Sequence, residues 1–285
     1  MPLKSSSALR LHIRDRLVPT LPLQEADQIA RLIIEALFGI SISAQLLDRP
    51  IQISLASERE ISSIIQRLLK HEPIQYVLGY SEFFGHRFKT DNRALIPRPE
   101  TEELVQMVLQ QQIRQSSTIL DVGTGSGCIA ISLALAGNSQ VYAMDLDSNT
   151  LDLARENAKA LDANLQFIHA DFLTDLVELP VLDIIVSNPP YVPESDLPSL
   201  EARVRDYEPS AALFVSDHDP LIFYRRMVEI APLYLKPGGQ VFMEIYHTAG
   251  PDIVRLFEQS RWSQVQVTKD INGNDRLLHA ILHSG

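Results

Sequence analysis

From residue 118 onward the chain alternates short apolar runs of strand length with segments of helical spacing. The apolar runs are Thr118–Val122, Gln140–Asp145, Leu165–Asp171, Leu182–Asn188 and Gln240–Ile245, with helices expected at Cys128–Ala136, Leu151–Leu161, Leu221–Leu235 and near Ile253–Ser260. Short apolar strands separated by helices predict a parallel sheet covered on both faces. Two strands, Gln264–Thr268 and Leu277–Leu282, follow, and the turn residues Asn272–Asp275 between them predict an antiparallel last strand. The expected fold class is α/β with a Rossmann-like sheet.

The first part of the chain has a different period. Apolar residues three or four apart over residues 5–72 predict amphipathic helices, and Ser57 with Glu60 resembles a capping box for the last of them. From residue 75 the period falls toward two, with Phe83, Gly85 and Phe88 indicating a hairpin. We therefore expect a helical bundle over 1–73, a β-hairpin linker over 74–96 and the α/β domain over 97–285.

Charge and cysteine content restrict the class of protein. The chain has 25 basic and 36 acidic residues, a net charge of −11. Such a balance argues against a protein that tracks DNA through its phosphates. Cys128 is the single cysteine, which excludes a disulfide framework or a multi-thiolate metal site and fits a reducing cytosol. No apolar stretch reaches the roughly 20 residues that span a bilayer.

A glycine-rich segment, Asp121–Gly127, follows the first strand of the expected sheet. Its glycines, Gly123, Gly125 and Gly127, are interleaved with Thr124 and Ser126, a spacing unlike the dinucleotide fingerprint. Asp145 ends the next strand, where an acid can accept both ribose hydroxyls. Asp121 would repel a pyrophosphate, so a cationic nucleoside without phosphate, S-adenosylmethionine, suits the loop better. The plainer alternative is a tight turn with incidental glycines.

Two residues at the end of the third strand are further candidates for this ligand. By position, Asp171 can accept hydrogen bonds from the adenine amine, and Phe172 can pack on the adenine ring. The alternative is that Asp171 caps the next turn and Phe172 belongs to the core.

The tetrapeptide Asn188-Pro189-Pro190-Tyr191 closes the fourth strand. Asn188 and Pro189 each precede a proline and are therefore held extended. The Asn188 side-chain oxygen and the Pro189 carbonyl can face outward as two acceptors for a planar NH₂ group, with Tyr191 against its face. Such acceptors stabilise the charge that develops on a poorly nucleophilic amide nitrogen as it attacks a methyl group. The alternative is a stiff turn without chemistry.

With these two motifs the chain resembles the peptide chain release factor N(5)-glutamine methyltransferase family, of the PrmC/HemK type. Other matching stretches are Pro73–Tyr76 with Gly79, Phe84-Gly85 with Phe88, Ile96–Glu102, Tyr207–Pro209 with Ala212-Leu213, and Gly273–Arg276. The resemblance implies a class I S-adenosylmethionine-dependent methyltransferase domain over 97–285 and a helical domain that recognises the substrate. It implies methylation of the glutamine amide in the Gly-Gly-Gln loop of class 1 release factors, which are the expected partners.

The resemblance also implies residue roles. The loop Gly123–Gly127 with Asp121, Asp145, Asp171 and Phe172 would hold S-adenosylmethionine, with Asn188 beside it. Asn188, Pro189, Pro190 and Tyr191 would hold the glutamine amide, and Arg98, Pro99, Glu100 and Thr101 would line the substrate mouth. Relatives often have tryptophan at the position of Phe172 and glycine at that of Tyr246. We expect a cytoplasmic monomer without metal, membrane or direct nucleic-acid contacts.

Three other functions remain open from the sequence. A DNA adenine N6-methyltransferase also acts on a planar NH₂ group, but it must flip its base and needs phosphate contacts, which the charge disfavours. A glutamine methyltransferase of a ribosomal protein shares both domains, although Arg98–Glu102 fits the release-factor branch better. A binding module that retains a nucleoside site without catalysis is the third.

Overall fold

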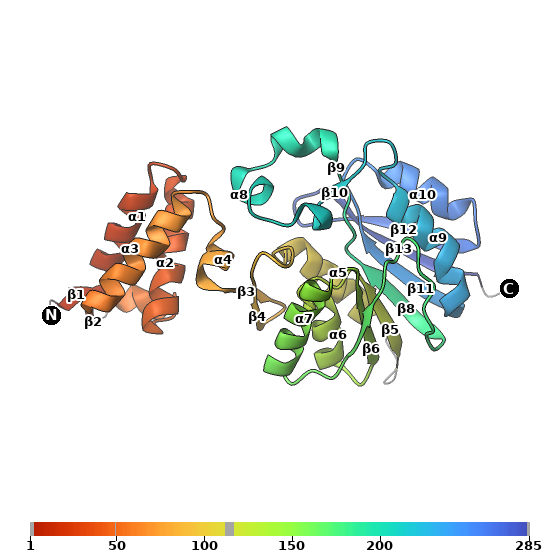
Figure 1. Cartoon of the computed structure of the whole chain (residues 1–285), viewed down its shortest axis with the longest axis horizontal. Coiled ribbons are helices and arrows are strands. Elements are labelled where there is room, and N and C mark those ends of the chain that lie inside the picture. Colours follow the sequence, from red (N-terminus) through yellow and green to blue (C-terminus); the bar gives the residue numbers. More distant parts are fainter. Residues whose placement is uncertain (1–2, 49, 112–116, 284–285) are drawn as a thin grey trace. The chain divides into compact units, whose positions relative to one another are not determined.

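The computed structural model of the chain describes residues 3–48, 50–111 and 117–283, which form two compact units (Figure 1). One unit consists of the described residues up to Gly79 together with Ala202–Tyr207, and the other of Tyr80–Glu201 and the described residues from Glu208 onward. The predicted domains over 1–73, 74–96 and 97–285 were drawn from sequence period and stay a prediction. Within the described ranges, no helix has the length and apolar content that crossing a bilayer requires.

The first unit is helical, as expected. Its helices α1 (Ser6–Leu17), α2 (Leu23–Phe38) and α3 (Leu55–Leu68) enclose a core that includes Leu9, Ile13, Leu17, Ala30, Ile33, Ile34, Ile61, Ile65 and Leu68. The unit also contains the strand pair β1 (Leu3–Ser5) and β2 (Pro50–Gln52), the 3₁₀ turn η1 (Ala44–Leu47), α4 (Ile74–Leu78) and α8 (Ala202–Arg205). Arg203 of α8 forms an ion pair with Glu25 of α2.

Two local predictions for this unit are wrong. The cap of α3 is Ser54, whose hydroxyl accepts the Ser57 N–H at 3.0 Å, so Ser57 lies inside the helix and does not begin it. Residues 74–78, expected to be extended, form α4 between Pro73 and Gly79, where φ is +79°. A five-residue helix is too short to be distinguished from a strand by period.

The predicted hairpin is present but shorter. Strands β3 (Tyr80–Phe83) and β4 (His86–Lys89) pair antiparallel. Both residues of the turn have positive φ, +49° at Phe84 and +78° at Gly85. This is the turn geometry that matches the twist of a two-residue hairpin.

The second unit is built on a seven-stranded sheet in the order β12-β13-β11-β8-β5-β6-β7. The strands are β5 (Thr118–Val122), β6 (Gln140–Asp145), β7 (Gln166–His169), β8 (Leu182–Ser187), β11 (Leu235–Glu244), β12 (Trp262–Lys269) and β13 (Asp275–Leu282). Neighbours from β11 to β7 are parallel, and β13 is antiparallel to both of its neighbours. The predicted α/β sheet and its antiparallel last strand are confirmed.

Helices cover both faces of the sheet (Figure 1). One apolar cluster joins the sheet to α5 (Pro99–Gln110), α6 (Cys128–Ala136) and α7 (Ser148–Ala160), and the other joins it to α9 (Ile222–Tyr234) and α10 (Gly250–Glu258). Between β8 and α9 the chain forms η2 (Glu194–Ser199), η3 (Ser210–Ala212) and the parallel pair β9 (Val192–Pro193) and β10 (Phe214–Val215).

The order of the strands indicates where in the sheet a ligand site is expected. Successive strands run from β5 outward to β7, and the chain then returns to β8 on the other side of β5. In such sheets, ligands bind beyond the carboxyl ends of the strands at the point where the order reverses. Val122 and Ser187 are register partners at that point, so the segments that follow them begin side by side.

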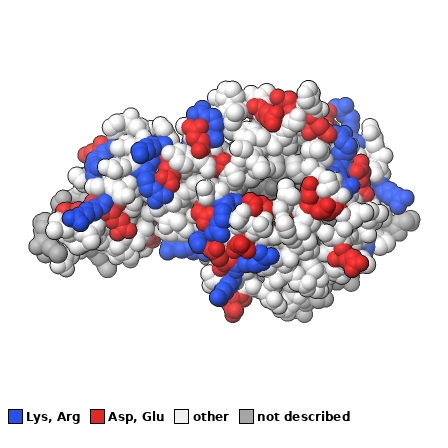
Figure 2. Space-filling view, in the orientation of Figure 1, with Lys and Arg blue, Asp and Glu red and all other residues white. Residues whose placement is uncertain are grey.

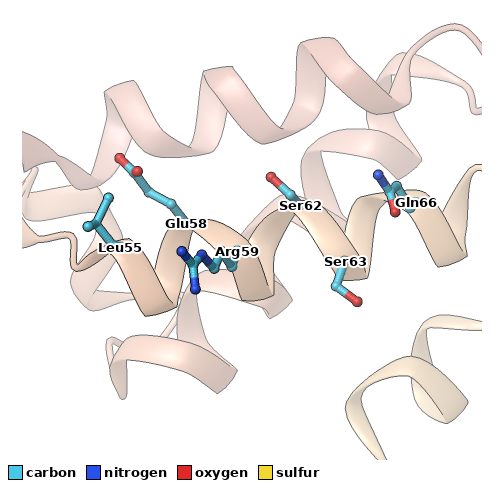
Figure 3. A pocket seen from close by; sticks show the side chains of 6 residues that line it. All are labelled: Leu55, Glu58, Arg59, Ser62, Ser63 and Gln66. Atoms are coloured by element: carbon cyan, nitrogen blue, oxygen red, sulfur yellow. The ribbon is translucent and has the colours of Figure 1, made fainter.

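The exposed face of α3 carries a shallow pocket of its own (Figure 3). Its lining side chains are Leu55, Glu58, Arg59, Ser62, Ser63 and Gln66, all from this one helix. None of them belongs to the glycine loop or to the Asn-Pro-Pro-Tyr segment.

Candidate active site

The glycine loop leaves β5 and enters α6. The N–H groups of Gly123 and Thr124 both donate to the Met144 carbonyl at 2.9 Å, which fastens the loop to the end of β6. At Gly127, where φ is +82°, a Cβ would lie only 2.9 Å from Ile131 Cδ1. A Cβ at Gly123 would meet nothing within 4 Å. Gly127 therefore serves packing, whereas the backbone at Gly123 is open to a ligand.

The side chain of Asp121 is hydrogen-bonded to the glycine loop. Its side chain is fully buried, and Oδ2 accepts hydrogen bonds from Thr124 Oγ1 at 2.7 Å and from Ala130 N at 3.2 Å. Its Oδ1 has no hydrogen-bond partner within the described ranges. Burial raises the pKa of Asp121 to about 7, although these two hydrogen bonds oppose the change. The carboxyl group thus joins the loop to the first turn of α6.

Asp145, at the end of β6, faces the same loop. Its Oδ2 accepts the Gly125 N–H at 2.9 Å, and its Oδ1 accepts the Asp147 N–H at 3.1 Å. Burial raises the pKa of Asp145, and both N–H groups oppose this increase. The half-buried carboxylate still has lone pairs, so it can accept further hydrogen bonds from hydroxyl groups of a ligand.

The Asp171-Phe172 pair lies after β7, next to Asp145. The Ala170 N–H donates to the Asp145 carbonyl at 3.1 Å, and Asp171 Oδ1 accepts the Leu173 N–H at 2.8 Å. Phe172 is partly buried and packs against the apolar cluster that joins the sheet to α9 and α10. Its carbonyl accepts a hydrogen bond from Arg226 Nε at 3.1 Å. Asp171 therefore caps a turn, and Phe172 is only partly buried.

The Asn-Pro-Pro-Tyr segment begins directly after β8. Ser187 Oγ donates to the Val122 carbonyl at 2.8 Å, which joins this strand end to the start of the glycine loop. Asn188 Nδ2 donates to Thr101 Oγ1 at 3.2 Å, and Pro189 is buried. The predicted cofactor loop and the predicted tetrapeptide are thus neighbours at the carboxyl edge of the sheet.

Glu244, at the end of β11, is the residue of this site that the sequence analysis missed. It is 1% exposed, and it accepts hydrogen bonds from Thr101 Oγ1 at 2.7 Å and from Tyr191 OH at 2.8 Å. Burial raises the pKa of Glu244, while the two hydroxyls and the charge of Arg276 lower it. The available signal was one acidic residue directly after the apolar residues 241–243 at the carboxyl end of the strand.

Two stacked tyrosine rings lie next to the hydrogen bonds of Glu244. The rings of Tyr191 and Tyr246 stack with centroids 6.0 Å apart, and Tyr246 OH donates to Asp196 Oδ2 at 2.5 Å. Burial and the nearby carboxylate raise the pKa of Tyr246 to about 12. Tyr246 therefore adds an aromatic surface beside Tyr191 and connects it, through Asp196, to η2.

The four residues predicted at the substrate mouth lie in different environments. Glu208, whose side chain is 1% exposed, accepts from Arg98 Nη2 at 2.5 Å and from the Ile96 N–H at 3.1 Å. Pro99 is exposed at the first position of α5, and Glu100 Oε1 accepts from Asn272 Nδ2 at 3.1 Å. Thr101, 2% exposed, lies behind Asn188.

Comparisons with known proteins bear on both units. The family model described as "PrmC N-terminal domain" matches residues 12–79, and the one described as "Methyltransferase small domain" matches residues 100–201. The chain is 42% identical over 271 residues to the Bacteroides thetaiotaomicron protein named release factor glutamine methyltransferase, covering 94% of this chain and 97% of that one. A Bacillus cereus protein of the same name is 41% identical, covering 80% and 83% of the two chains.

Solved structures support the fold. A methyltransferase from Pyrococcus furiosus superimposes with a TM-score of 0.53 at 19% identity, covering 79% of this chain and 99% of that one. The T. thermophilus 16S rRNA N2 G1207 methyltransferase, solved with AdoMet and guanosine, gives a TM-score of 0.52 at 20% identity, covering 72% and 50%. At these identities the likeness concerns the fold alone.

Proposed function

The chain belongs to the release factor glutamine methyltransferase family, and we propose that Asn188 is the residue on which its catalysis depends. The enzyme transfers a methyl group from S-adenosylmethionine to the side-chain amide nitrogen of the glutamine in the Gly-Gly-Gln motif of class 1 release factors. Relatives that are 42% and 41% identical carry the name of this activity. The remaining steps concern how this chain's own residues perform it.

The cofactor fits the loop by two features of the residues present. The backbone at Gly123 faces open space, and the carboxylate of Asp145 retains free lone pairs beside Gly125. When bound, S-adenosylmethionine supplies a methyl group on a positively charged sulfur. We propose that Asp145 accepts the ribose hydroxyls, that the loop Gly123–Gly127 receives the charged end, and that the exposed part of Phe172 packs on the adenine.

The observation that carries the proposed mechanism is the place of Asn188. It follows Ser187, which is hydrogen-bonded to the strand end from which the glycine loop departs. Its Oδ1 and the carbonyl of Pro189 act as two acceptors for the NH₂ group of the substrate glutamine. Both acceptors strengthen their hydrogen bonds as positive charge develops on the attacking nitrogen, so they stabilise the transition state more than the ground state.

We propose that aromatic side chains near Asn188 shield one side of the reacting amide from water. Tyr191 and Tyr246 provide stacked rings there. Arg98, held by Glu208, remains 32% exposed and keeps donors for carbonyl groups of a substrate loop. We propose that the helical unit recognises the rest of the release factor, since the reaction machinery described above lies entirely in the second unit.

Surface charge favours a protein substrate over a nucleic acid. The net charge is −11, and basic and acidic side chains are interspersed over the face shown in Figure 2. Duplex DNA binding draws on clustered basic groups that neutralise phosphates. The DNA adenine methyltransferase alternative therefore has less physical support than the release-factor reaction.

Mass spectrometry of candidate substrates tests the proposed function. The enzyme is incubated with S-adenosylmethionine and, in separate reactions, with a class 1 release factor, with the same factor carrying Gly-Gly-Asn, with a mixture of large-subunit ribosomal proteins and with duplex DNA. We expect a gain of one methyl group on the Gly-Gly-Gln peptide and none in the other reactions. Methylation of a ribosomal protein or of DNA with the release factor left unmodified would reject the proposal.

A further inference from the structure

A buried chain of hydrogen bonds lies behind the side chain of Asn188. Asn188 Nδ2 donates to Thr101 Oγ1 at 3.2 Å, and Thr101 Oγ1 donates to Glu244 Oε2 at 2.7 Å. The three residues come from the segment after β8, the first turn of α5 and the end of β11. Thr101 is 2% exposed and Glu244 is 1% exposed, so neither side chain is free to contact a substrate directly.

With Glu244 ionised, the donors and acceptors of this chain have one consistent assignment. Glu244 as a carboxylate can only accept, and its second oxygen accepts from Tyr191 OH at 2.8 Å. Burial raises the pKa of Glu244, but the hydrogen bonds from Thr101 and Tyr191 and the positive charge of Arg276, whose Nη1 lies 3.4 Å from Tyr191 OH, all favour the ionised form. The single hydroxyl hydrogen of Thr101 is therefore committed to Glu244, and its oxygen can only accept from Asn188.

This assignment fixes which end of the Asn188 amide faces inward. Because Thr101 offers Asn188 an acceptor and no donor, the NH₂ group of Asn188 must point at Thr101. Its Oδ1 must then point away from α5. An amide turned by 180° would bring two acceptor oxygens together, Asn188 Oδ1 and Thr101 Oγ1, and would present N–H groups to the NH₂ group of the substrate.

We propose that Thr101 and Glu244 are positioning residues that lock the Asn188 side chain with its oxygen toward the substrate amide. The inference rests on the proposed function of Asn188 and adds to it the source of its orientation. Without the lock, the amide samples both orientations, and the reactive one must be restored before each methyl transfer. A misplaced catalytic group of this kind costs roughly 10- to 100-fold in rate.

Two substitutions at Thr101 distinguish the effect of its hydroxyl group from the effect of its side-chain volume. Thr101→Val removes the hydroxyl at nearly constant size, and Thr101→Ser keeps the hydroxyl and loses a methyl group. We expect single-turnover methyl transfer to a release factor to fall roughly 10- to 100-fold in Thr101→Val and to recover to within about threefold in Thr101→Ser. The affinity for S-adenosylhomocysteine and the KM for the release factor should change by less than about threefold in both.

Glu244→Gln tests the same lock from its far end. Glutamine has nearly the same shape, but one end of its amide donates, so it can no longer accept from both hydroxyls. If its NH₂ faces Thr101, the Thr101 hydrogen becomes free to bond Asn188 Oδ1 and to hold the amide in the wrong orientation. We expect a loss of rate similar to that of Thr101→Val, again without a comparable loss of cofactor affinity.

A spectroscopic readout makes the test independent of catalysis. In ¹⁵N-labelled protein, the side-chain NH₂ signals of Asn188 are identified by their loss in Asn188→Asp. Their exchange with solvent should be slow in wild type and Thr101→Ser, and at least about tenfold faster in Thr101→Val. Equal exchange rates in all three proteins, or wild-type transfer by Thr101→Val, would overturn the positioning proposal. Wild-type protein that leaves the release factor unmodified contradicts the proposed function instead, and the exchange rates still decide the orientation.

Discussion

Replacing Asp121 with asparagine should change how stability depends on pH. The Asp121 carboxyl group is fully buried, and its Oδ1 has no partner within the described ranges. Asparagine keeps an oxygen that can accept from Thr124 Oγ1 and Ala130 N, but it places an unpaired NH₂ group where Oδ1 lies. An unpaired buried donor costs about 1–3 kcal/mol at every pH.

The magnitude of the pH effect follows from the raised pKa. The pKa of Asp121 rises from its ordinary value of 3.8 to about 7, because burial penalises the charged form. Between these values the folded protein binds a proton that the unfolded chain has lost, so stability falls as the pH rises through this window. At about 1.4 kcal/mol for each pKa unit, this group removes about 2–3 kcal/mol between pH 5 and pH 8.

The two effects combine into a specific expectation. At pH 5 the two proteins should differ in stability by about 1 kcal/mol or less, because the stability that wild type has already lost above pH 3.8 offsets the cost of the unpaired NH₂ group. At pH 8 the carboxylate is charged, and Asp121→Asn should be at least as stable as wild type. Urea unfolding of the cofactor-free proteins at both pH values measures the difference, and Asp162→Asn, at an exposed position, serves as the control of equal charge change. A gap between Asp121→Asn and wild type that is the same at pH 5 and pH 8 would refute the reasoning.

Three further predictions concern the loop and the helical unit. Asp145→Ala should weaken S-adenosylhomocysteine binding by about 1.5–3 kcal/mol in calorimetry, because it removes a charged acceptor, and unchanged affinity would contradict its ribose role. Gly127→Ala should lower the free energy of unfolding by about 2–4 kcal/mol, because φ is positive there and the added Cβ would lie 2.9 Å from Ile131 Cδ1. Gly123→Ala should lower the free energy of unfolding by only about 1–2 kcal/mol, but it should lose much of its affinity for the cofactor. Ser54→Ala should cost about 1 kcal/mol of stability in urea unfolding, and an equal cost for Ser57→Ala would argue against the observed cap.

Much of the fold could be predicted because its signal is local. The parallel strands β5, β6 and β8 are short and mostly apolar, and the loop Gly123–Gly127 falls between β5 and α6, as expected. The errors lie where one short pattern fits two structures. Ser54 and Ser57 both offer a capping hydroxyl, and the five residues 74–78 are too few for their apolar period to distinguish a helical turn from a strand.

Some residues of the candidate site could also be predicted from local signals, and others could not. Asn188 and Asp145 could be predicted because each stands at the end of a strand, and parallel strands bring their carboxyl ends to one edge. Glu244 could not, because its partner Thr101 is 143 positions away in the sequence and a buried acid has no periodic signal. Glu208, 110 positions from Arg98, was matched only as part of a family motif, without its role as the support of that arginine.

Single-turnover transfer by Asn188→Ala tests the central claim most directly. Labelled methyl transfer to a class 1 release factor is followed with the enzyme in excess, and S-adenosylhomocysteine affinity is measured separately on the same protein. Loss of the Oδ1 acceptor should slow transfer by about 10²- to 10³-fold, with cofactor affinity nearly unchanged. Asn188→Asp, which keeps an acceptor of the same shape, should retain partial activity. Transfer by Asn188→Ala at the wild-type rate would contradict the acceptor mechanism.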